Sequence, residues 1–581
     1  MKQPRNEYPR PEFRRDSWLC LNGEWDFSIE EKTFDQKIVV PYACETKLSG
    51  VEDKGFHKVV WYRKKFLLPE EMREKKILLH FGAVDYACDL WVNGRYIRSH
   101  VGGQTSFSAD ITDALIQNEN CIELKVRDDY EDLEMPRGKQ FWELESSGIF
   151  YSRTTGIWQS VWLEAVNQLY MVSCHITPEF DARAVRFEYS LSRPGAVAVE
   201  FNITFEGREA GKVRVVPQSA KGSVAVKLDQ GGLQAWNFQE ELAWTPENPK
   251  LFDVEFKIYG EEGISDRVES YFGMRKVSIE NGRFMLNNRE YYQKLVLDQG
   301  YWKESLLTAP TDEAFIKDIQ LVKEMGFNGV RKHQKVEDPR FLYHADRMGL
   351  LVWGEIGSAY VYSREYVHRM YAEWMEAVER DYNHPCIVVW TPLNESWGVQ
   401  EIKVDELEKA HCNAMVYMTK SIDSGRAVVD NDGWEHTCGD LLTIHDYSSD
   451  AKVLQKHFNS MESILALCPG GRSLFADGWE YQGQPILVTE FGGVRYAPDS
   501  KEKGSWGYCE AKDANDFTTQ YAALTGAVLD SPLIQGYCYT QFTDVETEEN
   551  GLLTYQRELK IPIETIRAIN ENNSFYINVE E

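Results

Sequence analysis

The fold is decided by the stretch Cys386-Ile387-Val388-Val389-Trp390-Thr391-Pro392-Leu393-Asn394-Glu395. Its apolar, largely β-branched first half is typical of a strand buried on both faces, and its end carries an amide and a carboxylate. An amphipathic segment, Ser363–Tyr382, comes shortly before it and has the spacing of a helix that covers a sheet. A helix followed by a buried strand predicts a parallel sheet with helices on its outer face.

The same alternation of apolar runs and amphipathic segments continues through the last part of the chain, from about residue 276 onward. We predict eight strands there, at Tyr291–Asp298, Gly326–His333, Leu350–Ile356, Cys386–Glu395, Ala427–Asp432, Leu441–Tyr447, Pro485–Glu490 and Ile534–Asp544. Eight β/α units indicate a TIM barrel, whose active site lies at the carboxyl ends of its strands. We therefore expect a catalytic (β/α)8 domain over residues 276–581.

Two β-rich regions precede the expected barrel. Residues 1–165 contain short alternating runs, and within Asp89–Ile97 the pair Asn93-Gly94 favours a type I′ hairpin turn. We predict a jelly-roll sandwich there. Residues 166–275 contain further alternating runs, such as Val199–Phe205, which predict a small immunoglobulin-like sandwich.

The composition excludes several classes of partner. With 64 Lys and Arg against 92 Asp and Glu, the net charge is −28, which disfavours nucleic acid and anionic membrane surfaces. No apolar run approaches the ~18 residues of a membrane span. The N-terminus lacks the apolar core of a secretory signal, so we expect a cytoplasmic protein. The eleven cysteines are scattered and predict reduced thiols rather than disulfides.

Every predicted barrel strand ends in polar or ionisable residues, and two carboxylates follow strongly apolar strands. The polar ends include Asp298-Gln299, Arg331-Lys332-His333, Glu355, Asn394-Glu395, Asp430-Asn431-Asp432, His445-Asp446-Tyr447, Glu490, Gln541 and Asp544. Glu395 and Glu490 end the fourth and seventh strands, where we expect them to face solvent across the barrel mouth. Paired carboxylates carry out glycoside hydrolysis, one as acid and the other as nucleophile or base. The alternative is that each forms a structural ion pair with Arg331 or Lys332.

Several motifs resemble those of family 2 glycoside hydrolases, which include β-galactosidases, β-glucuronidases and β-mannosidases. The segment ending in Asn394-Glu395-Ser396 resembles the acid/base motif of that family, and Val488–Gly492 resembles its nucleophile motif. Other similar segments, in the same order as in the family, are Leu21–Trp25, Gly156–Trp158, Trp244–Pro249, Phe272–Arg275, Gly326–Arg331 and Arg380–Pro385. The resemblance covers nearly the whole chain and implies a carbohydrate substrate.

The resemblance implies a retaining, exo-acting mechanism of double displacement. Glu490 would attack the anomeric carbon, and Glu395 would protonate the leaving group and later deprotonate water. Asn394 would donate to the sugar 2-OH, and the Tyr447 hydroxyl would hold Glu490, although Tyr447 could instead be a packed strand-end residue.

Further residues are candidates for holding the sugar. Trp397 and Trp434, together with Trp302 and Trp479, are candidate stacking platforms, with core packing as the alternative. The remaining candidates for binding sugar hydroxyls are Arg331, His333, Asp298, Asp446 and Glu355.

Three departures from the family concern metal and sugar. Ala359 and Val361 stand where large β-galactosidases place metal ligands, so we expect catalysis without metal or other cofactor. The acidic segment Glu548–Gly551 stands in place of the Asn-x-Lys motif with which β-glucuronidases bind the carboxylate of their substrate. Lys332 or Lys335 could still bind such a carboxylate. Leu297-Asp298 replaces an Arg/His pair, which changes the hydroxyl-reading pocket.

We rank β-galactosidase first, and a β-hexuronidase or another β-glycosidase second. A non-catalytic carbohydrate-binding protein is the remote alternative. A homo-oligomer is left open.

Overall fold

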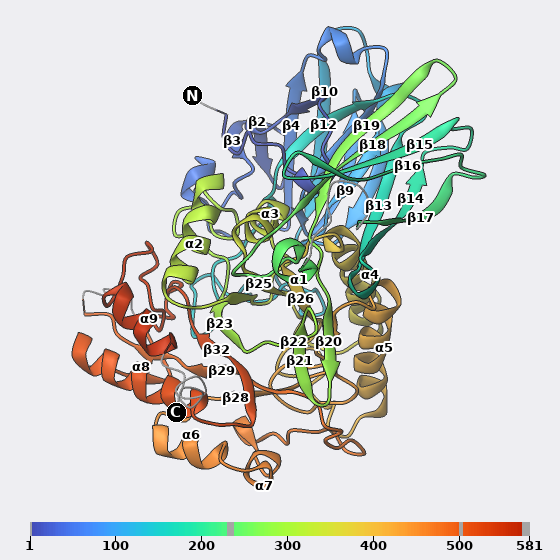
Figure 1. Cartoon of the computed structure of the whole chain (residues 1–581). Helices are drawn as coiled ribbons and strands as arrows, with labels where there is room; N and C mark the ends of the chain where they lie inside the picture. Colours follow the sequence, from blue (N-terminus) through green and yellow to red (C-terminus); the bar gives the residue numbers. More distant parts are fainter. Residues whose placement is uncertain (1–2, 229–236, 499–503, 572–581) are drawn as a thin grey trace.

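The chain folds into two β-sandwiches and a parallel barrel, as the sequence predicts (Figure 1). The computed structural model describes residues 3–228, 237–498 and 504–571. In Figure 1 the two sandwiches lie together above the barrel, and the chain runs from the blue sandwich through the green one into the yellow-to-red barrel. The exact domain boundaries, at residues 1–165, 166–275 and 276–581, stay a prediction.

The N-terminal jelly roll consists of two main antiparallel sheets, ordered β3-β2-β4-β10-β7-β8 and β1-β12-β5-β9. Its strands are β1 (Trp18–Cys20), β2 (Gly23–Ile29), β3 (Gln36–Val40), β4 (Val59–Phe66), β5 (Lys76–Phe81), β6 (Val84–Asp85), β7 (Ala87–Val92), β8 (Arg95–Val101), β9 (Phe107–Asp110), β10 (Asn120–Arg127), β11 (Gly156–Ile157) and β12 (Val161–Val166). Asn93 and Gly94 have φ of 51° and 76° between β7 and β8, which is the turn geometry that the sequence predicts.

The middle region is a sandwich of a three-stranded and a four-stranded antiparallel sheet, ordered β13-β14-β17 and β16-β15-β18-β19. Its elements are β13 (Met171–Glu179), β14 (Ala184–Leu191), β15 (Ala198–Phe205), β16 (Arg208–Val215), β17 (Lys221–Lys227), α1 (Phe238–Leu242), β18 (Phe252–Gly260) and β19 (Gly263–Phe272). A small hairpin sheet of β20 (Val277–Glu280), β21 (Arg283–Leu286) and β22 (Arg289–Glu290) leads into the barrel.

All eight predicted barrel strands are present in one parallel sheet, ordered β27-β26-β25-β24-β23-β32-β29-β28. They are β23 (Gln293–Asp298), β24 (Gly329–Lys332), β25 (Leu351–Glu355), β26 (Ile387–Thr391), β27 (Ala427–Val428), β28 (Leu442–Asp446), β29 (Ile486–Gly492) and β32 (Ile534–Thr540). The sheet order ends at β27 and β28, so the seam of the barrel lies between its fifth and sixth strands. β26 and β29 are buried along their full length, as their apolar sequences require.

Helices cover the outside of the barrel. They are α2 (Asp312–Glu324), α3 (Pro339–Met348), α4 (Arg364–Asp381), α5 (Glu406–Ile422), α6 (Ala451–His457), α7 (Met461–Leu465), α8 (Ala514–Leu529) and α9 (Ile563–Glu571). A short pair, β30 (Val494–Arg495) and β31 (Cys509–Glu510), follows β29. None of the helices in the described ranges is long and apolar enough to cross a membrane. The eleven cysteines are free thiols and most are buried.

A loop of the N-terminal region, residues 128–155, packs against the carboxyl end of the barrel. The Gly138 amide donates to the Ser358 carbonyl at 3.0 Å, and the Tyr360 amide donates to the Leu133 carbonyl at 2.9 Å. These backbone contacts join the loop to the segment after β25. The N-terminal region therefore contributes side chains to the face where a barrel carries its chemistry.

Candidate active site

Glu395 and Glu490 meet at the carboxyl end of the barrel. One carboxylate oxygen of each lies within 4.8 Å of the other, and a ring nitrogen of His445 lies within the same distance of both. Retaining glycosidases hold their two carboxyl groups ~5–5.5 Å apart, whereas inverting enzymes separate them by ~6.5–9.5 Å to admit a water. The spacing fits the retaining geometry.

Glu395 lies in an unusual backbone turn directly after β26. Glu395 and Ser396 have φ of 53° and 58°, in the left-handed region that side chains rarely adopt. Such a residue costs ~1–3 kcal/mol and persists only where its surroundings hold it. Here the Glu395 amide donates to the Asp432 carbonyl at 3.0 Å and the Ser396 amide donates to Asn431 Oδ1 at 2.8 Å. The strained turn directs the carboxylate into the site.

Arg331, at the end of β24, is the centre of the cluster and is fully buried. Its guanidinium donates to Glu490 Oε1 at 2.9 Å and to Asn394 Oδ1 at 2.6 Å, and it forms close ion pairs with Asp432 and Glu355. Burial opposes its charge, but the carboxylates outweigh burial and raise the pKa of Arg331 far above its usual range. Arg331 therefore orients the nucleophile candidate and the amide together.

His445, at the end of β28, bridges three carboxylates. Its Nδ1 lies 2.8 Å from Glu395 Oε1 and 3.5 Å from Glu490 Oε2, and its Nε2 lies 2.8 Å from Asp432 Oδ2. Burial would lower the pKa of His445, but the charges of Glu490 and Asp432 and the bond to Glu395 raise it to about 10. At neutral pH the ring is an imidazolium.

The same contact acts on the candidate acid. Burial would raise the pKa of Glu395, but the hydrogen bond and charge of His445 outweigh it and lower that pKa. In the resting site the shared proton therefore lies on His445, next to Glu395.

Asn394 and Tyr447 contact Arg331 and Glu490, respectively. The Asn394 Nδ2 is buried and has no hydrogen-bond partner in the part of the chain that the structure describes, so it is a free donor. The Tyr447 hydroxyl donates to Glu490 Oε2 at 2.7 Å, and its ring stacks on Tyr508 with 3.4 Å between ring centroids. Tyr447 and Arg331 thus hold different oxygens of the Glu490 carboxylate: Tyr447 holds Oε2, and Arg331 Nη1 holds Oε1.

The other predicted polar residues divide into two groups. His333 lies in the cluster, with Nδ1 3.0 Å from Arg331 Nη2, and burial and the Arg331 charge lower its pKa, so its ring is neutral. Asp298 instead forms an ion pair with Lys332 at 2.6 Å, and Asp446 pairs with His457 at 2.6 Å. These two carboxylates are therefore engaged outside the group formed by Glu395, Glu490 and Arg331.

The lysines proposed as uronate readers are also engaged. Lys332 Nζ contacts both Asp298 and Glu337, and Lys335 Nζ donates to the carbonyls of Gly300 and Leu307 at 2.7 and 2.8 Å. Neither ammonium is free to meet a substrate carboxylate.

Two of the four candidate tryptophans border the cluster. The Trp434 ring lies 5.6 Å from the ring of His445, and Trp397 follows Glu395 directly and lies 5.5 Å from the ring of Phe150. Trp302 packs in the barrel core against Phe315, so the alternative of core packing holds for it. Trp479 is 36% exposed and lies between α7 and β29.

Lys139 does not end a barrel strand but comes from the loop of residues 128–155. Lys139 is 6% exposed, and its Nζ lies 5.0 Å from the centroid of the Trp397 ring. Among the described residues it has no hydrogen bond or ion pair through Nζ. Its charge contributes to lowering the pKa of Glu395. No local sequence pattern marks this lysine, because only the packing of the N-terminal loop on the barrel brings it to the site.

Three further residues complete the site. Asp432 and His445 lie at strand ends that the sequence marks as polar, and the same rule could have assigned them a role. Tyr151 donates its hydroxyl to Glu548 in a short hydrogen bond, and Asn550 Nδ2 donates to Glu548 Oε1 at 3.0 Å. Burial raises the pKa of Glu548 above its usual value.

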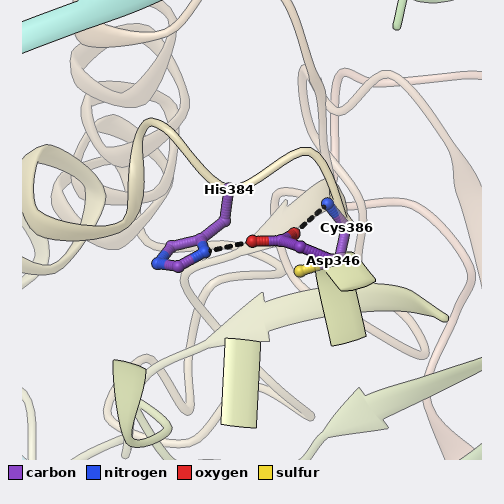
Figure 2. Close-up of side chains that lie close together, drawn as sticks. All are labelled: Asp346, His384 and Cys386. Carbon is purple, nitrogen blue, oxygen red and sulfur yellow. Dashed lines mark hydrogen bonds and ion pairs between the residues drawn. The ribbon is translucent and has the colours of Figure 1, made fainter. Parts of the chain in front are cut away.

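Two groups in the described residues have the spacing of metal ligands. One is the set Glu395, His445 and Glu490 itself. The other, Asp346, His384 and Cys386, lies at the amino end of β26 (Figure 2). Asp346 Oδ2 accepts from His384 Nδ1 at 2.6 Å, and Oδ1 accepts from the Cys386 amide at 2.8 Å. Both carboxylate oxygens are thus in use.

The second group connects domains rather than offering an open metal site. The Tyr271 hydroxyl, from the end of β19, donates to Asp346 Oδ2 at 2.8 Å, and Trp244 Nε1 donates to the Asp346 carbonyl at 2.7 Å. Burial and the Asp346 charge raise the pKa of the Cys386 thiol far above its usual range, so it offers no thiolate. The group fixes the middle sandwich onto the barrel.

Comparison with known proteins agrees with the architecture. Three models of glycosyl hydrolases family 2 match the chain: the sugar binding domain at residues 38–163, the middle domain at 169–275 and the TIM barrel domain at 277–530. A solved structure of the β-D-glucuronidase of Dictyoglomus thermophilum has a TM-score of 0.78 at 18% identity, covering 97% of this chain and 98% of that one. At this identity the likeness shows the fold alone.

Curated relatives carry two different activity names. A β-galactosidase of Thermoanaerobacter pseudethanolicus is 27% identical over 407 residues, which cover 67% of this chain and 52% of that protein. A putative β-glucuronidase of Formosa agariphila is 24% identical over 354 residues, which cover 59% of this chain and 40% of that protein. The match spans about half the length of these relatives or less. Three domain matches in the family order, over most of the chain, show that this chain belongs to glycosyl hydrolase family 2.

Proposed function

We propose that the protein is a retaining exo-β-glycosidase that releases a terminal sugar by double displacement, with Glu490 as nucleophile and Glu395 as acid/base. The observation that carries the proposal is the approach of the two carboxylates to within 4.8 Å, each held by separate hydrogen-bond partners. The two carboxylates repel each other, and Arg331 and His445 hold them close together, an arrangement that suits a nucleophile and an acid acting on one bond.

In the first step a Glu490 oxygen bonds to the anomeric carbon as the bond from that carbon to the leaving oxygen breaks. The leaving oxygen takes a proton from Glu395. Arg331 and Tyr447 bond to separate oxygens of Glu490, so the attacking carboxylate is fixed before substrate arrives. In the second step Glu395 removes a proton from water, which attacks the same carbon and frees Glu490.

His445 supplies the proton that Glu395 lacks in the resting site. The charge of Glu490 is a principal reason for the high pKa of His445. As Glu490 bonds to the sugar it loses that charge, the pKa of His445 falls, and its proton passes to Glu395 and on to the leaving oxygen. Attack by the nucleophile and delivery of the proton are coupled through this one ring.

Asn394 and the tryptophans hold the sugar. The free Nδ2 of Asn394 donates to the 2-OH, a contact that strengthens in the oxocarbenium-like transition state. Trp397 and Trp434 offer ring faces at the rim of the cluster.

β-Galactosides are the first candidate substrates, in line with the ranking from sequence and with the name of one curated relative. β-Hexuronides are the second, favoured by Lys139. This buried ammonium has no carboxylate partner among the described residues, and a substrate carboxylate would provide one. The cytoplasmic location stays a prediction, and a homo-oligomer stays open.

The test is hydrolysis of aryl β-galactoside, β-glucoside, β-mannoside, β-glucuronide and β-galacturonide by wild type, Glu490→Ala and Lys139→Met. We expect one sugar to be cleaved, with the β-anomer as first product by NMR, and the cleavage to be lost in Glu490→Ala. If the sugar is a uronide, Lys139→Met should raise KM by at least about tenfold, since it removes a charge-assisted hydrogen bond. A first product of inverted configuration would contradict the retaining mechanism, and no cleavage of any glycoside would favour a binding role.

A further inference from the structure

A cavity lies at the amino end of the barrel, between the middle sandwich and the amino ends of β26 and β27. Its volume is about 440 Å³. Its lining includes Thr177 from β13, Arg275 and Lys276 from the link between β19 and β20, Tyr382 after α4, and Arg426 before β27. Glu395 and Glu490 lie at the opposite, carboxyl ends of the strands, so this cavity is separate from the candidate active site.

Arg426 shows how a guanidinium in this cavity is normally satisfied. It donates from Nε to the Ile387 carbonyl at 2.8 Å and from Nη2 to the carbonyls of Tyr382 and His384 at 2.8 and 2.7 Å. It also forms a close ion pair with Asp423. Its charge and its donors are therefore matched by the protein.

Arg275 has none of these partners. It is 7% exposed, and across the described residues its guanidinium makes no hydrogen bond and no ion pair. Its Nε is buried without a partner. Burial and then the neighbouring charge of Arg426 lower the pKa of Arg275, since the protein opposes this cation more than it supports it.

The other charged side chains of the lining are already paired, and among its uncharged polar side chains only the Ser424 hydroxyl has no partner in the described residues. The hydroxyls of Thr177 and Tyr382 lie 2.8 Å apart, and Lys276 Nζ contacts Asp181 Oδ2 at 2.8 Å. Asn383 Oδ1 accepts from the Ile176 amide and its Nδ2 donates to the Cys174 carbonyl, both at 2.8 Å. The described lining thus leaves one guanidinium, that of Arg275, to meet a ligand.

The buried Nε of Arg275 lacks a partner, which destabilises the charged side chain, and a bound anion would offset that cost. A guanidinium binds carboxylate or phosphate through two parallel hydrogen bonds. The volume lies in the ~300–1,000 Å³ range of small-molecule sites, which occur preferentially between domains. The volume exceeds the needs of a bare ion.

We propose that this cavity is a binding site for a small organic molecule that carries a phosphate or carboxylate group, and that Arg275 binds that group. The proposal does not rest on the glycosidase activity, because the site lies at the opposite end of the barrel. Because the ligand would contact both the middle sandwich and the barrel, its binding should stabilise their junction.

The test is isothermal titration of the full chain with three probes: inorganic phosphate, glucose 6-phosphate and D-glucuronate. We expect at least one to bind saturably and to raise Tm, and Arg275→Gln to weaken that binding by at least about tenfold. The matched control is Arg208→Gln, which removes an exposed arginine of the same sandwich, in β16, and should bind as wild type does. Binding retained in Glu490→Ala separates this site from the candidate active site.

The three probes also distinguish the ligand group. Binding of phosphate and glucose 6-phosphate without D-glucuronate assigns a phosphate site, and the reverse assigns a carboxylate site. Equal binding by wild type and Arg275→Gln, or no saturable binding of any probe to wild type, would overturn the proposal.

A second measurement covers the case in which Arg275→Gln does not fold. Hydrogen exchange of wild type, with and without the probe that binds, should show protection confined to residues 176–182, 382–385 and 423–426. Protection only at the carboxyl end of the barrel would place the ligand in the active site and overturn the proposal.

Discussion

The barrel holds a buried histidine–carboxylate cluster at each end, and the two clusters differ in charge. At the amino end, His384 faces the single carboxylate of Asp346, whose oxygens also accept from Tyr271 and from the Cys386 amide. At the carboxyl end, His445 and Arg331 contact four carboxylates, those of Glu355, Glu395, Asp432 and Glu490. One cluster is balanced, and the other has two more acids than bases.

The surplus of negative charge suits the chemistry proposed for the carboxyl end. Four carboxylates against these two cations leave up to 4 − 2 = 2 negative charges, and the nearby Lys139 reduces the surplus to one. An oxocarbenium-like transition state develops positive charge at the sugar, which such a prearranged field stabilises without reorganisation. The balanced cluster at the amino end can only hold domains together. The comparison predicts that changes at one end remove activity, and changes at the other remove stability.

The largest effect should come from Glu490→Ala, which removes the proposed nucleophile. We expect kcat to fall on the order of 10⁴-fold or more, while the fold survives. The position of Glu490 at a strand end predicts that it faces solvent, but it is 4% exposed, because Arg331 and Tyr447 draw its carboxylate into the barrel. Asp432 and Glu355 still neutralise Arg331 in the variant, so Tm should change little. Full activity in the variant would exclude Glu490 as the nucleophile.

Glu395→Gln should come next, with an effect that depends on the leaving group. Without the acid, aryl glycosides with poor leaving groups should slow by ~10²–10⁴-fold, and those with the best leaving groups should slow least. The measurement is kcat/KM across aryl glycosides of graded phenol pKa. An equal loss across the series would contradict the acid role.

At the amino end, Asp346→Asn should destabilise the protein and leave its chemistry unchanged. The variant removes the charge that holds the buried His384, at a cost of about 3 kcal/mol. The control Cys386→Ala keeps the backbone bond to Asp346 and should cost about 1 kcal/mol or less. For both variants, chemical denaturation measures the free energy of unfolding, and kcat per folded molecule measures the chemistry. A fall in kcat of the folded variant would show that the two ends are coupled.

The smallest effect is the pH dependence of stability in His445→Gln. The pKa of His445 is raised to about 10, above the ~6.5 of an exposed histidine. The contribution of protonated His445 to the stability of the fold is therefore complete below pH ~6.5 and is lost as pH rises towards 10. The Tm difference from wild type should narrow between pH 6 and pH 9, with kcat also reduced.

His384→Gln gives the matched control, because the Asp346 charge also raises the pKa of His384. The Tm difference should narrow with rising pH in the same direction, with kcat of the folded protein unchanged. A Tm difference that is constant over this pH range in His445→Gln would rule out an imidazolium there.

The sequence predicted the features that local pattern determines. The eight strands follow from apolar runs of strand length, and Glu395 and Glu490 follow from their position directly after such runs. It could not predict orientation: Asp298 and Asp446 also end strands, but Lys332 and His457 engage them. Nor could it predict Lys139, whose neighbours Glu395 and Trp397 lie far away in the chain. Contacts between two domains produce no hydrophobic or polar pattern in the sequence of either contacting segment, so the sequence alone does not predict them.

The loop of residues 128–155 has a consequence for how such proteins diversify. Lys139 and Tyr151 reach the catalytic end of the barrel from a separately folded sandwich, while both proposed reacting carboxylates belong to the barrel. Recombination that exchanges the first sandwich between relatives would therefore replace part of the pocket wall in one event and keep the reacting groups intact. A library of grafted N-terminal loops on this barrel is accordingly a direct route to new sugar preferences.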